Sequence, residues 1–270
     1  MKKLLFTILL GSLMIFTLAA CGSNGEEEAT SSSDGSGESS SGYDLVEEGK
    51  LTFAASGEFR PFSMTTGGEM TGFDIDVGNA VAKELGLEPA QEKSKFAAIV
   101  EGVKTGRYDI AVASHTITEE RAKEVNFSTP YYYSGAQIFT RPGSDYKTLE
   151  DLEGLEIAVS KGSTYVKFAE DVTENVKVYD SDVVALQALA KGRHDAVITD
   201  FLTGKEAIGQ GLEIEGKKMI ERSDQAIAVA KGKDKLLEDI NAALETLREN
   251  GTLTEISEKY FNDDITTVPE

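Results

Sequence analysis

The side chains best suited to hold a small anion lie close together in the segment 114–121. Ser114 and Thr116 follow the short apolar run 108–112, which predicts a buried strand bounded by Gly106. Side chains two residues apart point to the same side of a strand, so both hydroxyls can face one way from the strand end.

Residues 119–123 then predict the start of a helix with Thr118 as its N-cap. The first turn of a helix presents backbone N–H groups without helical partners, and Arg121 adds a fixed positive charge there. Hydroxyls, amide groups and a guanidinium in one place are suited to bind a carboxylate.

The elements around this segment predict an α/β fold. A strand over 51–55 precedes a helix that Asp74 is expected to cap and Gly86 to end, and an apolar helical stripe from Phe96 to Val103 follows. The pattern then starts again, with strands expected over 155–159, 176–179 and 195–199 and helices over 164–170 and from the cap Ser181 to Gly192.

Two short sequences suggest that these halves are similar lobes. Gly106-Arg-Tyr-Asp and Gly192-Arg-His-Asp both stand at a helix-to-strand junction, and each strand ends on a polar residue, Ser114 in one and Asp200 in the other. Ligands of such sheets bind beyond the carboxyl ends of the strands. We therefore expect Ser114 and Asp200 to face a shared cleft.

Two extended segments, 131–140 and 226–230, are expected to cross between the lobes, and paired crossovers are typical of a hinge. A long helix over 234–250 follows the second crossover. The predicted organisation is a signal peptide at 1–20, a lipidated cysteine and tether at 21–42, lobe 1 at 43–134 and 226–270, and lobe 2 at 135–225.

The beginning of the chain predicts export and anchoring. Lys2 and Lys3 precede an apolar run that ends at Ala20, and Cys21 is the only cysteine. The run is short for an uncleaved span of about 20 residues. The segment resembles the lipobox of bacterial lipoproteins, which places a lipid on Cys21 and the protein on the outer side of the cytoplasmic membrane. The Ser-, Gly- and Glu-rich stretch after it predicts a flexible tether.

Composition excludes several classes of function. Without Lys2 and Lys3 the formal net charge falls from −20 to −22, whereas nucleic-acid binding needs a basic patch. Two isolated histidines and one cysteine predict neither a metal site nor a cofactor. Period-two geometry turns His115 away from Ser114 and Thr116 into the core, and His194 is expected at the surface.

The motifs resemble bacterial extracellular solute-binding proteins of family 3, which serve amino-acid ABC importers. The likeness rests on the order and spacing of many short motifs: Phe59-Arg-Pro-Phe62, Gly72-Phe-Asp-Ile-Asp76, Gly106-Arg-Tyr-Asp109, Thr116-Ile-Thr-Glu-Glu-Arg121, Phe127-Ser-Thr-Pro-Tyr131, Asp151-Leu-Glu-Gly154, Lys161-Gly-Ser-Thr164, Gly192-Arg-His-Asp195, Asp200 and Asn250-Gly-Thr-Leu253.

The resemblance implies a type II periplasmic-binding-protein-like fold whose two α/β lobes close on one L-amino acid. It implies a monomer that binds a free amino acid and delivers it to a membrane permease, with no enzymatic activity. It assigns Arg121, Ser163 and Thr164 to the ligand α-carboxylate. It also assigns the α-ammonium to Asp200 with Ser114 and Thr116, and aromatic walls to Phe59 and Phe96.

Other readings of these residues remain open in the sequence. Arg121 could pair with Glu120 or Glu124 on a solvated helix, and Asp200 could serve only as a helix N-cap. The same fold could carry a dehydratase or lyase for a small carboxylic acid, with Glu58 as the extra acid or base, or a sensor without a transport role. The lack of an evident second arginine or second carboxylate favours a neutral polar ligand such as glutamine or cystine.

Overall fold

The computed structural model describes residues 42–268, which belong to one compact unit. The predicted signal peptide and the anchor at Cys21 lie outside the described residues, as does the tether up to residue 41. None of the helices within 42–268 has the length and apolar character needed to cross a membrane.

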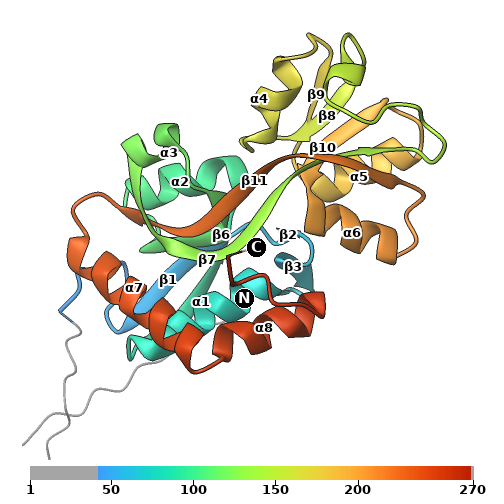
Figure 1. Cartoon of the computed structure of the whole chain (residues 1–270). Helices are drawn as coiled ribbons and strands as arrows, with labels where there is room; N and C mark the ends of the chain where they lie inside the picture. Colours follow the sequence, from blue (N-terminus) through green and yellow to red (C-terminus); the bar gives the residue numbers. More distant parts are fainter. Residues whose placement is uncertain (1–41, 269–270) are drawn as a thin grey trace, which may run out of the picture. The chain divides into compact units, whose positions relative to one another are not determined.

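An eight-stranded mixed sheet is the backbone of the fold (Figure 1). Its strands lie in the order β5 (Glu88–Lys93), β1 (Lys50–Ala55), β6 (Ile110–Thr116), β11 (Glu215–Ala230), β7 (Val125–Thr140), β10 (Ala196–Asp200), β8 (Ile157–Ser160) and β9 (Val176–Tyr179). The order of the strands confirms the predicted α/β fold class and its two lobes, because a short set of parallel strands stands at each end.

In lobe 1 the strands β5, β1 and β6 are parallel, and alternate residues enter two different cores. Leu51 and Phe53 of β1 face one core, and Ala54 faces the other, as the period-two geometry of a strand requires. The first core is covered by α1 (Phe73–Glu84), α7 (Asp234–Glu249) and α8 (Thr252–Phe261), and the second by α2 (Phe96–Lys104).

Lobe 2 repeats this arrangement on β8 and β10. Ile157 and Ile198 face one core with α4 (Tyr165–Glu170), while Ala158 and Val197 face the other with α5 (Asp182–Ala190). A 3-10 turn η1 (Glu150–Leu152) and helix α6 (Phe201–Gly209) complete the lobe. Both lobes therefore bury their strands on two faces, which explains the short, continuously apolar runs in the sequence.

The lobes are joined by β7 and β11, two strands of 16 residues each that pair antiparallel along most of their length. Figure 1 shows them running side by side from one lobe to the other. The sequence predicts extended structure only over 131–140 and 226–230, because the first part of β11 is polar and largely exposed. The sequence of this part of β11 has no apolar pattern that predicts a strand, and its pairing with β7 is a tertiary contact.

Two details differ from the sequence-based expectations, and two predicted helix caps are confirmed. Gly72, and not Asp74, stands at the N-cap of α1, and the Asp74 side chain is fully buried. The hairpin strands β2 (Glu58–Phe59), β3 (Ser63–Thr66) and β4 (Glu69–Thr71) and the edge strand β5 were not expected, since they lack an alternating apolar pattern. The N-caps Thr118, on α3 (Glu119–Glu124), and Ser181, on α5, are confirmed.

Candidate ligand-binding site

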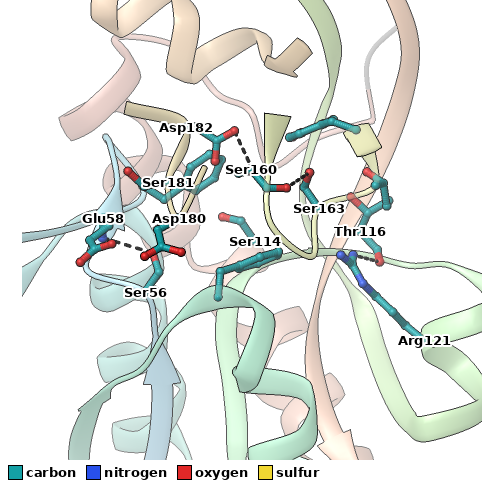
Figure 2. A pocket seen from close by; sticks show the side chains of 14 residues that line it. Ser56, Glu58, Ser114, Thr116, Arg121, Ser160, Ser163, Asp180, Ser181 and Asp182 are labelled. Atoms are coloured by element: carbon teal, nitrogen blue, oxygen red, sulfur yellow. Dashed lines mark hydrogen bonds between the residues drawn. The ribbon is translucent and has the colours of Figure 1, made fainter. Parts of the chain in front are cut away.

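A cavity lies at the carboxyl ends of the parallel strands of both lobes (Figure 2). Ser114 and Thr116 come from the end of β6, Ser160 from the end of β8, and Asp180 directly follows β9. The full lining consists of Ser56, Glu58, Phe59, Phe96, Ser114, Thr116, Arg121, Ser160, Ser163, Thr164, Tyr165, Asp180, Ser181 and Asp182.

Arg121 connects the two lobes at one end of this cavity. Its backbone N–H donates to the Thr118 hydroxyl (3.1 Å), so the helix cap fixes the start of α3. One guanidinium nitrogen donates to the Thr116 carbonyl (2.9 Å) and another to the carbonyl of Gly162 in lobe 2 (2.9 Å). Burial lowers the pKa of the guanidinium, but arginine stays charged at neutral pH. A guanidinium has five N–H donors, so donors beyond the two used in these contacts remain available to bind an anion.

The turn between β8 and α4 brings Ser163 and Thr164 next to lobe 1. Gly162 has a left-handed φ of 79°, and a Cβ atom there would come within 3.0 Å of Ala97 in α2. Only glycine permits both this conformation and this approach. The Ser163 hydroxyl donates to the Ser160 carbonyl (2.8 Å), which holds the turn in place.

Phe59 and Phe96 form aromatic walls and also extend the core of lobe 1. Phe59 stacks on Phe62 with ring centroids 5.0 Å apart. Phe96 stacks on His115 at 4.7 Å, and the Arg121 guanidinium lies 5.8 Å from its ring centre. His115 is buried, as predicted, and burial holds its pKa well below the usual range.

His194 corrects the sequence analysis, because it is buried rather than at the surface. Its Nε2 lies 3.1 Å from the Ala185 carbonyl and its ring meets the edge of Tyr179 at 5.3 Å. The turn before β10 folds back against α5, the helix that precedes it, and this packing buries the ring.

Asp200 is the predicted site residue that the structure does not place among those lining the cavity. Its carboxylate caps α6, accepting from the backbone N–H groups of Leu202 (2.9 Å) and Thr203 (3.4 Å), and it also accepts from the Ser134 hydroxyl. Burial, and then the charge of Asp200, raise the pKa of the Tyr165 phenol, which does line the cavity. Burial raises the pKa of Asp200 to about 7.

Asp182, in the first turn of α5, lines the cavity in lobe 2 instead. Its Oδ1 accepts from the hydroxyls of Ser160 (2.9 Å) and Thr199 (2.6 Å), and burial raises its pKa. Sequence analysis missed Asp182 and four neighbouring lining residues of lobe 2. The residues are Ser160, Tyr165, Asp180, Ser181 and Asp182. Ser160 ends β8 and Asp180 directly follows β9, so the strand-end rule that identified Ser114 could have found these two.

Charged side chains of both lobes meet at the end of the cavity marked by Glu58 and Asp180, away from Arg121 in Figure 2. The Lys95 ammonium lies 3.5 Å from the Glu58 carboxylate and 3.4 Å from that of Asp180. Lys93 approaches Glu58 at 3.5 Å as well. Glu58 and Asp180 line the cavity, whereas Lys93 and Lys95 are not among the lining residues and pair with these carboxylates from outside it.

A two-lobed α/β fold with a polar cavity at the facing strand ends defines a ligand-binding class of protein. Residues 51–263 match the bacterial extracellular solute-binding proteins, family 3, and the chain belongs to this family. Membership makes it a solute-binding protein rather than an enzyme.

Named relatives agree with this family. The chain is 32% identical over 275 residues to the probable amino-acid-binding protein YxeM of Bacillus subtilis (strain 168), covering 98% of each. It is 32% identical over 230 residues to the L-cystine-binding protein TcyJ of Escherichia coli (strain K12), covering 82% of this chain and 86% of the relative. An ancestral arginine-binding protein bound to glutamine shares the fold with a TM-score of 0.75 and 36% identity, over 80% of this chain and 100% of that one.

The raised pKa of Asp200 predicts a pH-dependent stability. Its folded-state value of about 7 exceeds the ordinary value of 3.8, so the folded chain holds the proton more tightly than the unfolded chain. Its contribution to folding is complete below about pH 4 and is lost as the pH rises towards 7. Relative to Asp200→Asn, the wild-type protein should lose up to about 1.4 kcal/mol of unfolding free energy per pH unit in this window.

Urea unfolding of both proteins at about pH 4.5 and about pH 7.5 measures this difference. Burial also raises the pKa of Asp74 to about 7, but Asp74 is present in both proteins, so its contribution cancels from the stability difference. An equal stability difference at the two pH values would contradict the assignment.

Proposed function

We propose that this chain is the extracytoplasmic binding protein of an ABC importer, which takes a polar L-amino acid such as glutamine or cystine and delivers it to the membrane permease. The observation that carries the proposal is Arg121, a partly buried guanidinium that donates to a carbonyl of each lobe beside a polar cavity. Family membership and the named relatives support the amino-acid class.

In this proposal Arg121 binds the ligand α-carboxylate, since a guanidinium offers planar, paired donors to two oxygens. Ser163 and Thr164 close over the same group from lobe 2. Their turn is held against lobe 1 at Gly162, which supports a role in closure.

The α-ammonium goes to Asp200, with Ser114 and Thr116 opposite it in lobe 1. An ammonium taken out of water needs an acceptor, and a buried carboxylate is the strongest one. Asp200 is buried at the end of β10, which pairs with β8, and Asp182 lines the cavity with a second buried carboxylate. Phe59 and Phe96 enclose the aliphatic part of the ligand.

Lobe 1 is assigned to residues 43–134 and 226–270 and lobe 2 to 135–225, with the hinge where β7 and β11 pass between them. Contacts to ligand from both lobes make the closed arrangement the tighter-binding one. Cys21, at the start of the tether 21–42, anchors the monomer to the outer face of the cytoplasmic membrane through its lipid, so that the folded part can reach a permease.

The end of the cavity at Glu58 suits a side chain with a polar terminus. The Glu58 and Asp180 carboxylates offer acceptors there and the Ser56 hydroxyl offers a donor, which fits an amide or the second amino-acid head of cystine. Arginine is the second candidate, because Glu58, Asp180 and Asp182 place three carboxylates among the lining residues.

Replacement of Arg121 by alanine should weaken amino-acid binding by about 2–5 kcal/mol, because the ligand carboxylate would lose its partner in a closed cleft. Titration calorimetry on refolded, ligand-free protein measures this loss. Lys123→Ala is the matched control, since Lys123 is exposed on the same short helix. Equal affinity of the Arg121 variant and wild type would remove Arg121 from the site.

The cognate amino acid at about 100 times its Kd should raise the free energy of unfolding by about 2.7 kcal/mol. A thermal-shift panel of the common L-amino acids, cystine and citrulline on protein stripped by unfolding identifies it. Citrulline is a neutral analogue of arginine, so a response to arginine alone would establish a cationic ligand in place of glutamine or cystine. The absence of any response would reject the proposed function.

Asp200→Asn should weaken binding of the best ligand of this panel at least about tenfold, because hydrogen bonds to charged groups contribute roughly 1.5–3 kcal/mol. Asp195→Asn serves as the control. The Asp195 carboxylate lies at the opposite end of β10, where it accepts a hydrogen bond from the Glu156 N–H. A loss in Asp182→Asn but not in Asp200→Asn would transfer the ammonium to Asp182.

A further inference from the structure

Asp74 is a buried carboxylate that the proposed site does not use directly. It lies in the first turn of α1 with no exposed surface, and it does not cap the helix. Its Oδ1 accepts from the Tyr131 hydroxyl (2.6 Å) and its Oδ2 accepts from the Ser114 hydroxyl (2.8 Å). Burying a carboxylate is costly, so its position behind a cavity-lining residue calls for an explanation.

Ser114 is held in an unusual backbone conformation. Its φ of 56° lies in the left-handed region, and Asn262 is the only other described residue besides the glycines with a positive φ. Such a conformation costs roughly 1–3 kcal/mol in a side-chain-bearing residue and persists only where the surroundings impose it. The surroundings here are the Asp74–Tyr131 pair, because the Ser114 N–H also donates to the Tyr131 hydroxyl (3.0 Å).

The hydrogen bonds also fix which way each proton points. Tyr131 accepts from the Ser114 N–H and therefore turns its own proton to Asp74, and the Ser114 hydroxyl proton points to the same carboxylate. The Ser114 oxygen is then left with lone pairs only, the form that can accept from an ammonium. A carboxylate can receive both protons through its two oxygens, whereas an amide in its place has one oxygen and a donating NH₂ group.

We propose that Asp74 is a positioning residue of the binding site, which holds Ser114 in its left-handed conformation and directs its hydroxyl proton away from the ligand. The effect of Asp74 on ligand affinity rests on the proposed function. Its effect on the conformation of Ser114 does not depend on any ligand. Tyr131 lies on β7, so the same hydrogen bonds tie the strand end of β6 to a strand that enters lobe 2.

Asp74→Asn should weaken binding of the best ligand of the amino-acid panel at least about tenfold. Asp76→Asn is the matched control. Asp76 lies on the same first turn but pairs at the surface with Lys259 (2.6 Å) and Tyr260 (2.8 Å), and its replacement should leave affinity unchanged. Tyr131→Phe, which keeps the ring stacked on Phe73 (5.9 Å), is a second variant that removes only the hydroxyl and should reproduce the loss.

If Asp74 acts through Ser114, the effects of replacing Asp74 and Ser114 on ligand affinity should not be additive. Glycine adopts positive φ freely and has no hydroxyl to direct, so in a Ser114→Gly background Asp74→Asn should cost less than about twofold in affinity. A merely structural role of Asp74 would cost the same in both backgrounds, which would overturn the proposal.

Amide hydrogen exchange of ligand-free protein separates this proposal from the proposed function. The Ser114 N–H should exchange faster in Asp74→Asn and Tyr131→Phe than in wild type and Asp76→Asn, whether or not an amino acid binds. Unchanged Ser114 exchange in folded Asp74→Asn and Tyr131→Phe would overturn the proposal. A failure of the wild-type protein to bind any amino acid would reject only the proposed function.

Discussion

The antiparallel pairing of β7 with β11 is the interaction on which the rest of the structure depends. Each strand contributes to both lobes: β11 pairs with β6 in lobe 1, and β7 pairs with β10 in lobe 2. The sheet is therefore continuous, and the strand ends of the two lobes are held opposite each other. Several register shifts interrupt the pairing, and they give the ribbon local bends without breaking its connection.

With the lobes joined by this continuous sheet, a small number of polar contacts between them shapes the cavity. Arg121 reaches the Gly162 carbonyl at one end, and Lys95 reaches Asp180 at the other. The two contacts differ in character. The guanidinium is partly buried and donates to both lobes, whereas Lys95 and Asp180 are mostly exposed, and exposed ion pairs stabilise a protein little. The Arg121 end is the fixed part of the site, and the Lys95 end is the adaptable part.

Three buried carboxylates lie at or behind the cavity, one in lobe 1 and two in lobe 2. Asp74 supports Ser114, Asp182 receives Ser160, and Asp200 fixes the start of α6 and the hydroxyl of Ser134. The donors to Asp74 and Asp182 come from their own lobes, whereas Asp200 also accepts from Ser134, the last residue assigned to lobe 1. These hydrogen bonds offset part of the cost of burial, and burial still raises the pKa of all three carboxylates. Asp74 orients Ser114 from behind the cavity, whereas Asp182 lines the cavity itself.

Local sequence patterns are enough to predict the fold class, most of the strands and helices, and the candidate residues of lobe 1. Ser114, Thr116 and Arg121 follow from local rules, because strand ends, N-caps and helical first turns are encoded within a few neighbouring residues. The tertiary structure alone decided which carboxylates line the cavity and what supports Ser114. Asp180 and Asp182 reach the cavity, and Asp74 and Tyr131 meet behind Ser114, through contacts between segments far apart in the chain. Such contacts leave no periodic pattern or motif in the sequence, since they arise only when separate elements pack together.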